Sequence, residues 1–331
     1  MSLNKLSYII STETNPYHNI ALEEYLLKHV EKGECILYLW QNRKTVVIGY
    51  NQNAWKECRT DTLEADGGYL ARRLSGGGAV FHDMGNLNFT FLVRESDYDV
   101  ARQSEVILKA VQSFGIPAEK SGRNDLTVDG RKFSGNAFYI TGDFCYHHGT
   151  IMIRADKSEM GRYLNVSQEK LKSKGVESVR SRVVNLSEYV PDMTVSGMTE
   201  ALLTAFGTVY EGTPKELPES RILRDEIRLS SEHFGSWDWK YGRKIPFQHE
   251  ILKKFSWGEV LIQLHVSEGI VEQATIWSDG LDVDFPHAAA ELLQGTRYLS
   301  EDWKQLPEKL SGNDEYRKMM EDIILCLKEE A

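Results

Sequence analysis

The stretch that decides the fold of this chain is RRLSGGGAVFHDMGNLNFTF, residues Arg72–Phe91. Two arginines stand before three consecutive glycines, and a strongly alternating strand pattern follows. Glycine in an ordered strand is disfavoured by roughly 0.5 to 1 kcal/mol relative to alanine, so three in a row need a reason. One reason is close approach of an anionic ligand to bare backbone N–H groups beside an arginine. The other, commoner reason is a bulge or tight corner in the sheet.

The motifs that this stretch lacks narrow its chemistry. The pattern GxxxxGK[ST] of a P-loop is absent, and a strand rather than a helix follows the glycines, which excludes a Rossmann fingerprint. Ser75 and Ser134 lie outside any GxSxG elbow, so a hydrolase triad has no support. If the stretch has a function, it is to bind an anion through backbone N–H groups and cations, without a P-loop or a Rossmann loop.

Composition restricts the class of protein. The 331 residues carry a formal net charge of −10, which disfavours nucleic-acid binding because a phosphate backbone requires a clustered positive surface. No apolar run reaches the length of a membrane span, and the N-terminus lacks the pattern of a signal peptide. We expect a cytoplasmic protein that does not bind membranes.

The sequence contains no CxxC pair among its four cysteines, which are Cys35, Cys58, Cys145 and Cys326. This spacing predicts free thiols.

The order of periodic segments predicts an α/β (α+β) fold whose mixed sheet is largely antiparallel. Helices are expected at 15–33, with Asn15 as cap and Pro16 in the first turn, and at 100–114 and 167–175. The runs 35–40 and 45–49 are expected to pair as strands. We predict a catalytic domain at 1–244, a linker at 245–252 and a small accessory α+β domain at 253–331.

A second cluster, GRNDLTVDGRKFSGNAFY at 122–139, repeats the theme of glycine, cation and amide. Its Asp129-Gly130 pair predicts a type I′ hairpin turn. Taken alone, Lys132 beside such a turn is most simply a solvated charge. Two clusters of this kind in one domain could enclose an anionic ligand from two sides.

Histidine and cysteine chemistry gives weaker hypotheses. His147 and His148 are adjacent in a predicted strand and point to opposite faces, which disfavours a shared zinc ion. Cys145 could be an acyl acceptor near His148, although a buried inert cysteine is the commoner case.

Several separated motifs resemble the lipoate-protein ligase family in its long two-domain form. They are the opening stretch, SGRNDL, RKFSGNAF, HHGT and KGVESVRSRVVNL. The resemblance implies a catalytic fold shared with biotin ligases and octanoyltransferases. It also implies a two-step reaction in which ATP, with Mg²⁺, and lipoate give lipoyl-AMP, and an acceptor lysine then takes the lipoyl group.

Matching positions imply roles for individual residues. Lys132 corresponds to the family's essential lysine and would bridge the lipoate carboxylate and the α-phosphate. Asp125 would help to hold Mg²⁺ or orient the incoming lysine. The implied nucleotide-binding residues are Arg72, Arg73, Gly76, Gly77, Gly78, Ala79, Val80, Phe81, Asn124, Asp125 and Lys132. Sheet facing and small size suggest a lipoate tunnel lined by Trp40, Val47, Gly49 and Gly77, with His82, Asn86 and His148 at its polar mouth. Ser134 and Gly135 are further candidate lipoate-binding residues.

The implied acceptors are lipoyl domains of 2-oxoacid dehydrogenase acyltransferase subunits and the glycine-cleavage H protein. Docking of such acidic domains would require local basic residues such as Lys170, Lys172 and Lys174. Two other functions stay open: an ATP-independent octanoyl or lipoyl transferase that uses Cys145, and a non-catalytic lipoate-binding module.

Overall fold

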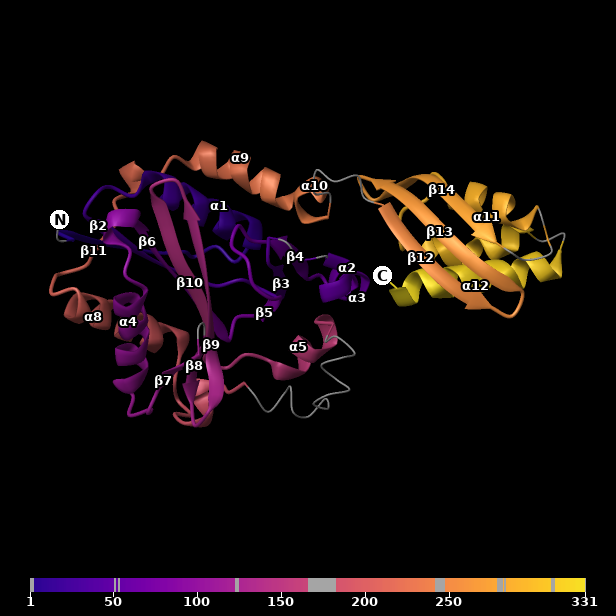
Figure 1. Cartoon of the computed structure of the whole chain (residues 1–331). Helices are drawn as coiled ribbons and strands as arrows, with labels where there is room; N and C mark the ends of the chain where they lie inside the picture. The colour runs from indigo at the N-terminus through magenta and orange to yellow at the C-terminus, as the bar shows by residue number, and fades with distance from the viewer. Residues whose placement is uncertain are drawn as a thin grey trace. The chain divides into compact units, whose positions relative to one another are not determined.

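A computed structural model describes residues 3–50, 52, 54–122, 125–165, 183–241, 248–278, 282, 284–310 and 313–330. The chain divides into two compact units, Met1–Gly235 and Ser236–Ala331 (Figure 1). Among the described helices, none combines the length and hydrophobicity that a bilayer span requires.

The first unit is built on an eight-stranded sheet (Figure 1). Its order is β11 (Lys215–Glu216), β1 (Lys5–Ile10), β2 (Glu34–Trp40), β6 (Asn86–Arg94), β10 (Phe144–Met152), β9 (Arg131–Thr141), β8 (Asp125–Val128) and β7 (Glu119–Ser121). Only the β11–β1 and β1–β2 pairs among these described strands are parallel. The mixed, largely antiparallel sheet is therefore confirmed.

A second sheet in this unit has three strands, in the order β4 (Tyr69–Arg72), β3 (Thr45–Ile48) and β5 (Val80–His82). The predicted pairing of 35–40 with 45–49 is wrong, because β2 already has β1 on one edge and β6 on the other. With both edges of β2 occupied, β3 pairs instead with β4 and β5. The stretch Arg72–Phe91 thus contributes β5 to the small sheet and the first part of β6 to the large one.

Helices cover both faces of the large sheet. The helices α4 (Val100–Gln112) and α8 (Val195–Val209) pack on the face that carries Leu87, Phe89, Phe91 and Val93. The helix α1 (Pro16–His29), flanked by α9 (Arg224–Gly235), lies on the other side (Figure 1). Asn15 caps α1 through its Oδ1, which accepts from the backbone N–H of Tyr17 at 2.9 Å, as predicted.

Shorter elements complete the first unit: α2 (Ala54–Glu57), α3 (Thr60–Ala65), α5 (Lys157–Tyr163) and the 3₁₀ turns η1 (Glu95–Asp97), η2 (Leu186–Glu188) and η3 (Glu219–Arg221). Asp129 and Gly130 between β8 and β9 have φ of 50° and 71°, which confirms the type I′ turn. All four cysteines are free and buried, as expected. The helix expected at 167–175 lies outside the described residues.

The second unit is a small α+β fold with a three-stranded antiparallel sheet, β12 (Gln248–Phe255), β13 (Gly258–Ser267) and β14 (Ile270–Ser278). The helix α11 (Phe285–Leu293) packs on β14 and α12 (Asp314–Glu330) on β12. The remaining elements are α10 (Trp237–Lys240), η4 (Glu301–Gln305) and η5 (Pro307–Leu310). Residues 248–252, expected in the linker, belong to β12, because pairing with β13 gives this polar segment a regular ladder.

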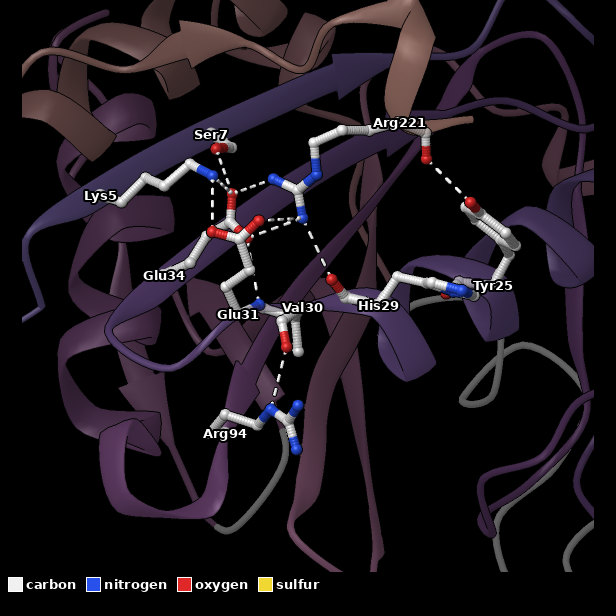
Figure 2. A network of polar contacts seen from close by, with 9 residues as sticks. All are labelled: Lys5, Ser7, Tyr25, His29, Val30, Glu31, Glu34, Arg94 and Arg221. Atoms are coloured by element: carbon white, nitrogen blue, oxygen red, sulfur yellow. Dashed lines mark hydrogen bonds and ion pairs between the residues drawn. The ribbon is translucent and has the colours of Figure 1, made fainter. Parts of the chain in front are cut away.

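One buried ion pair ties η3 to the large sheet (Figure 2). The fully buried carboxylate of Glu34 accepts from Arg221 at 2.7 Å and 3.0 Å, and from the Ser7 hydroxyl at 2.6 Å. Arg221 also donates to the carbonyl of His29 at 3.0 Å. Burial alone would raise the pKa of Glu34, but the hydrogen bonds from Arg221 and Ser7 outweigh it and lower the pKa to about 2.

This network predicts acid lability. Because the pKa of Glu34 is lowered on folding from 4.5 to about 2, its stabilisation is present above pH 4.5 and is lost as pH falls toward 2. Glu34→Gln should lower the free energy of unfolding at pH 7 by about 3 kcal/mol and flatten its pH dependence between those values. Denaturant unfolding at several pH values measures both effects. Glu31→Gln, at a half-exposed carboxylate near the same cations, should cost under about 1 kcal/mol; equal losses would contradict the prediction.

Candidate active site

A cavity of about 250 Å³ lies in the first unit, bounded by the large sheet, α1 and the small sheet. Both sequence clusters reach it: the triple-glycine segment supplies Gly77 and Gly78, and the hairpin supplies Asp125, Lys132 and Gly135. The structure therefore brings together two segments that sequence reasoning could only pair by hypothesis.

Most of the predicted site residues line this cavity: Trp40, Val47, Arg73, Gly77, Gly78, Ala79, Val80, His82, Asp125, Lys132, Gly135 and His148. Those described but outside the lining are Gly49, Arg72, Gly76, Phe81, Asn86 and Ser134. Asn124 lies outside the described residues. Lining residues that sequence reasoning missed are Ile20, Glu23, Asn88, Asn136, Ala137, Gly149 and Thr150.

Strand geometry explains two of the residues outside the lining. Side chains alternate along β5, so Val80 and His82 face the cavity while Phe81 turns away and packs on Tyr163 at 5.6 Å between ring centroids. Ser134 pairs in register with Leu126 of the core and is fully buried on that side of the sheet. Their part in binding stays a prediction that the cavity lining does not support.

Arg72 and Arg73 were both expected at the nucleotide, but they have different positions. Nη1 of Arg72 donates to the carbonyls of Gly49, Tyr50 and Gln52 at 3.1, 2.9 and 2.7 Å, away from the cavity. Arg72 therefore holds the chain that follows β3.

Arg73 is 6% exposed and lies beneath the glycine segment. Its Nη2 donates to the carbonyls of Gly76 and Gly78 at 2.7 and 2.8 Å, and its Nε to the Ser75 hydroxyl at 3.1 Å. Burial lowers the pKa of this guanidinium. Arg73 therefore fixes the backbone of residues 76–78 at the edge of the cavity that Arg73, Gly77 and Gly78 all line.

The triple-glycine segment also packs backbone to backbone. A Cβ built on Gly49 would lie 2.2 Å from the carbonyl oxygen of Gly77, so no other residue fits at position 49 without moving the segment. Gly77 itself has φ of 96°, a conformation that L side chains rarely adopt. Gly49 thus shapes the cavity without lining it.

Lys132 reaches the cavity because β9 carries a bulge. The register passes from Leu126↔Ser134 to Thr127↔Lys132, so Phe133 is the extra residue. The shift places Lys132, Gly135 and Asp125 on one face, where simple alternation would have separated Lys132 from Gly135. Nζ of Lys132 lies 2.8 Å from Oδ1 of Asp125, and both side chains are partly exposed.

A chain of hydrogen bonds crosses the cavity wall and ends on a carboxylate. Nδ1 of His148 lies 2.9 Å from Oε1 of Glu23, and Nε2 lies 2.7 Å from the Ser75 hydroxyl. Because the carboxylate only accepts, His148 donates from Nδ1, and in the tautomer that carries its one proton there Nε2 accepts from the Ser75 hydroxyl. Thr90 donates to the same Glu23 oxygen at 2.6 Å. Glu23 was missed, although a carboxylate on the apolar face of a predicted helix is a signal that could have found it.

His147 and Cys145 face away from this wall. His147 contacts Gln103 and Asn136 at 3.2 and 2.8 Å on the opposite face of β10 from His148, as alternation predicts. Cys145 is fully buried in the core of the same face, and burial raises the pKa of its thiol. A thiol so placed does not reach the cavity, which leaves the transferase alternative unsupported.

Known proteins resemble the whole chain. The Lipoyl protein ligase A/B catalytic domain family matches residues 15–207, and the Bacterial lipoate protein ligase C-terminus family matches residues 244–327. A lipoate-protein ligase A from Psychrobacter cryohalolentis is 38% identical over 328 residues, which cover 96% of this chain and 97% of that protein.

Solved structures agree with this likeness. P. falciparum LipL1 in complex with lipoate is 31% identical with a TM-score of 0.63, over 96% of this chain and 99% of that one. A bipartite lipoate-protein ligase from Thermoplasma acidophilum, studied with its E2 lipoyl domain, is 25% identical with a TM-score of 0.64, over 73% of this chain and 97% of that one. The chain therefore belongs to the lipoyl protein ligase A/B family, and it carries that family's catalytic domain followed by the bacterial lipoate protein ligase C-terminus.

Proposed function

We propose that this chain is an ATP-dependent lipoate-protein ligase. It activates lipoate to lipoyl-AMP and transfers the lipoyl group to a lysine of a lipoyl domain. The observation that carries the proposal is the meeting of Lys132 and the triple-glycine backbone in one cavity. A cation and bare backbone that line one cavity suit a substrate with a carboxylate and a phosphate at its centre.

In the first step an oxygen of the lipoate carboxylate attacks the α-phosphorus of ATP, and the bond to pyrophosphate breaks. In the second step the neutral ε-amine of the acceptor lysine attacks the acyl carbon, AMP leaves, and the amine loses its proton. Lys132 stays protonated throughout and holds carboxylate and α-phosphate oxygens together, so it stabilises charge and does not act as a nucleophile.

Arg73 holds the backbone of Gly76 and Gly78 in place, and this glycine segment would contact the nucleotide. Asp125 offers a partly exposed carboxylate, which fits Mg²⁺ because this ion takes one or two carboxylates and completes its shell with phosphate oxygens and water. When bound, Mg²⁺ would neutralise phosphate charge.

The other assignments are proposals of the same kind. The first unit would carry catalysis and the second would be accessory. The acceptors would be lipoyl domains of 2-oxoacid dehydrogenase acyltransferase subunits and the glycine-cleavage H protein, in the cytoplasm. The Thermoplasma ligase that pairs with an E2 lipoyl domain supports the first class of acceptor.

The reaction predicts opposite outcomes for two substitutions. Lys132→Ala should lower pyrophosphate release from Mg-ATP and lipoate by about 100-fold or more, because a preorganised charge is lost. Cys145→Ser should retain the rate. Activity lost with the Cys145 change but kept with the Lys132 change would favour a cysteine transferase, and absence of pyrophosphate from the unaltered protein would leave only a binding module.

The position of Lys132 also depends on Gly135. A Cβ on Gly135 would lie 2.8 Å from both Cε and Nζ of Lys132, so Gly135→Ala should displace the ammonium. We expect kcat for adenylate formation to fall by about 10- to 100-fold, while the protein stays folded. Thr141→Ala, at the exposed end of the same strand, is the control and should leave kcat unchanged. Equal rates for the two variants would show that the lysine need not lie where this structure has it.

Acceptor docking gives a further prediction. Lys170, Lys172 and Lys174 lie outside the described residues, and their role rests on charge alone. Replacing all three by Glu should raise the acceptor concentration for half-maximal transfer several-fold, because acidic domains are then repelled. Pyrophosphate release without acceptor should not change. Unchanged transfer kinetics would remove these lysines from the docking surface.

A further inference from the structure

The buried end of the cavity carries polar groups that the reaction does not use. Trp40 on β2 pairs in register with Asn88 on β6, and Asn88 pairs with Thr150 on β10. Lys132 lies on β9, the strand beyond β10. Three inter-strand spacings of about 4.8 Å place the Trp40 end roughly 14 Å from the strand of Lys132. A chain whose carboxylate meets Lys132 would bring its far end here.

Asn88 presents a free donor at this end. Its Oδ1 accepts from Nδ2 of Asn86 at 3.0 Å, which fixes the orientation of the amide. The residue is 1% exposed, and its Nδ2 has no hydrogen-bond partner within the described part of the chain. Asn86, expected at the ligand, instead sets the direction in which Asn88 donates.

His82, expected at the polar mouth, is instead buried beside Trp40 and presents a second donor. Nδ2 of Asn19 donates to Oδ1 of Asn42 at 3.0 Å, so the amide nitrogen of Asn42 faces Nδ1 of His82, at 3.3 Å. His82 therefore accepts at Nδ1. Burial lowers the pKa of His82 to about 3, so the neutral ring carries its one proton on Nε2. Nε2 is buried and has no partner among the described residues, and the ring packs edge-on against Trp40 at 6.1 Å.

Two buried N–H donors favour an occupant that brings acceptors. A buried donor left unpaired costs about 1–3 kcal/mol. A saturated acyl chain ends in a methyl group and leaves both donors unpaired, whereas a dithiolane ring ends in two sulfur atoms, which are weak acceptors. Sites built to hydrogen-bond a substrate reject analogues that lack the partner group.

We propose that Asn88 and His82 make the buried end of the cavity selective for an acyl group that carries sulfur acceptors, and so for the lipoyl group over a saturated chain. This inference rests on the proposed ligase function and adds its substrate selectivity. Asn88 and His82 are then specificity residues that contact the ring, far from the bonds that form and break.

The test compares two acids of the same shape. Lipoate and ω-cyclopentyl pentanoate have rings of equal size, but the second has no sulfur. In pyrophosphate release with Mg-ATP, kcat/KM should favour lipoate by about fivefold in the unaltered protein, since two weak hydrogen bonds are at stake. Asn88→Leu and His82→Phe should each reduce this ratio toward one. Ile20→Leu, at an apolar lining residue, should change both substrates alike.

Each outcome decides the inference. Equal use of both acids by the unaltered protein would overturn it, and so would a preference that survives both substitutions. If Asn88→Leu does not fold, as judged by its thermal unfolding, His82→Phe and the unaltered protein carry the comparison. Absence of pyrophosphate with either acid would refute the ligase function instead, and calorimetric binding of the two acids would then decide selectivity alone.

Discussion

The buried guanidinium of Arg73 is the interaction on which the rest of the site depends. It joins β3, through the carbonyl of Val47, to the triple-glycine segment, and it reaches the large sheet through Ser75 and His148. A buried cation is tolerable only when its donors are satisfied, and here backbone carbonyls do this. Glycine is needed at position 49 because any side chain there would clash with the backbone carbonyl of Gly77, in the segment that Arg73 binds.

The hydrogen bonds in this wall of the cavity all run in one direction, from donor to acceptor toward the carboxylate of Glu23. Donors run from Arg73 through Ser75 and His148 to Glu23, and from Thr90 to the same carboxylate. Each hydroxyl accepts one hydrogen bond and donates another, so the network has few alternative arrangements. A wall whose polar side chains are held in one arrangement keeps the shape of the cavity fixed around a flexible acyl chain. That rigidity matters because misplacing the reacting atoms by about 1 Å can cost roughly 100-fold in rate.

Sequence reasoning predicted the elements better than their partners. The cap and first turn of α1 and the type I′ turn follow from local chemistry, and both were confirmed. The pairing of β2 with β3 failed because strand partners depend on which edges are occupied by distant segments. The bulge at Phe133 has no local signature, so the face shared by Lys132 and Gly135 could not be predicted.

The two cations that the sequence singled out differ in how freely they can act. Arg73 is buried and bound to several acceptors, so moving it toward a ligand would leave carbonyls unpaired at a cost of about 1–3 kcal/mol each. Lys132 is partly exposed and holds one carboxylate, an ion pair worth under about 1 kcal/mol in water. A substrate anion can therefore displace Asp125 from Lys132 with little loss. Arg73 therefore maintains the shape of the glycine segment, and Lys132 supplies positive charge to the substrate, although their sequence motifs look alike.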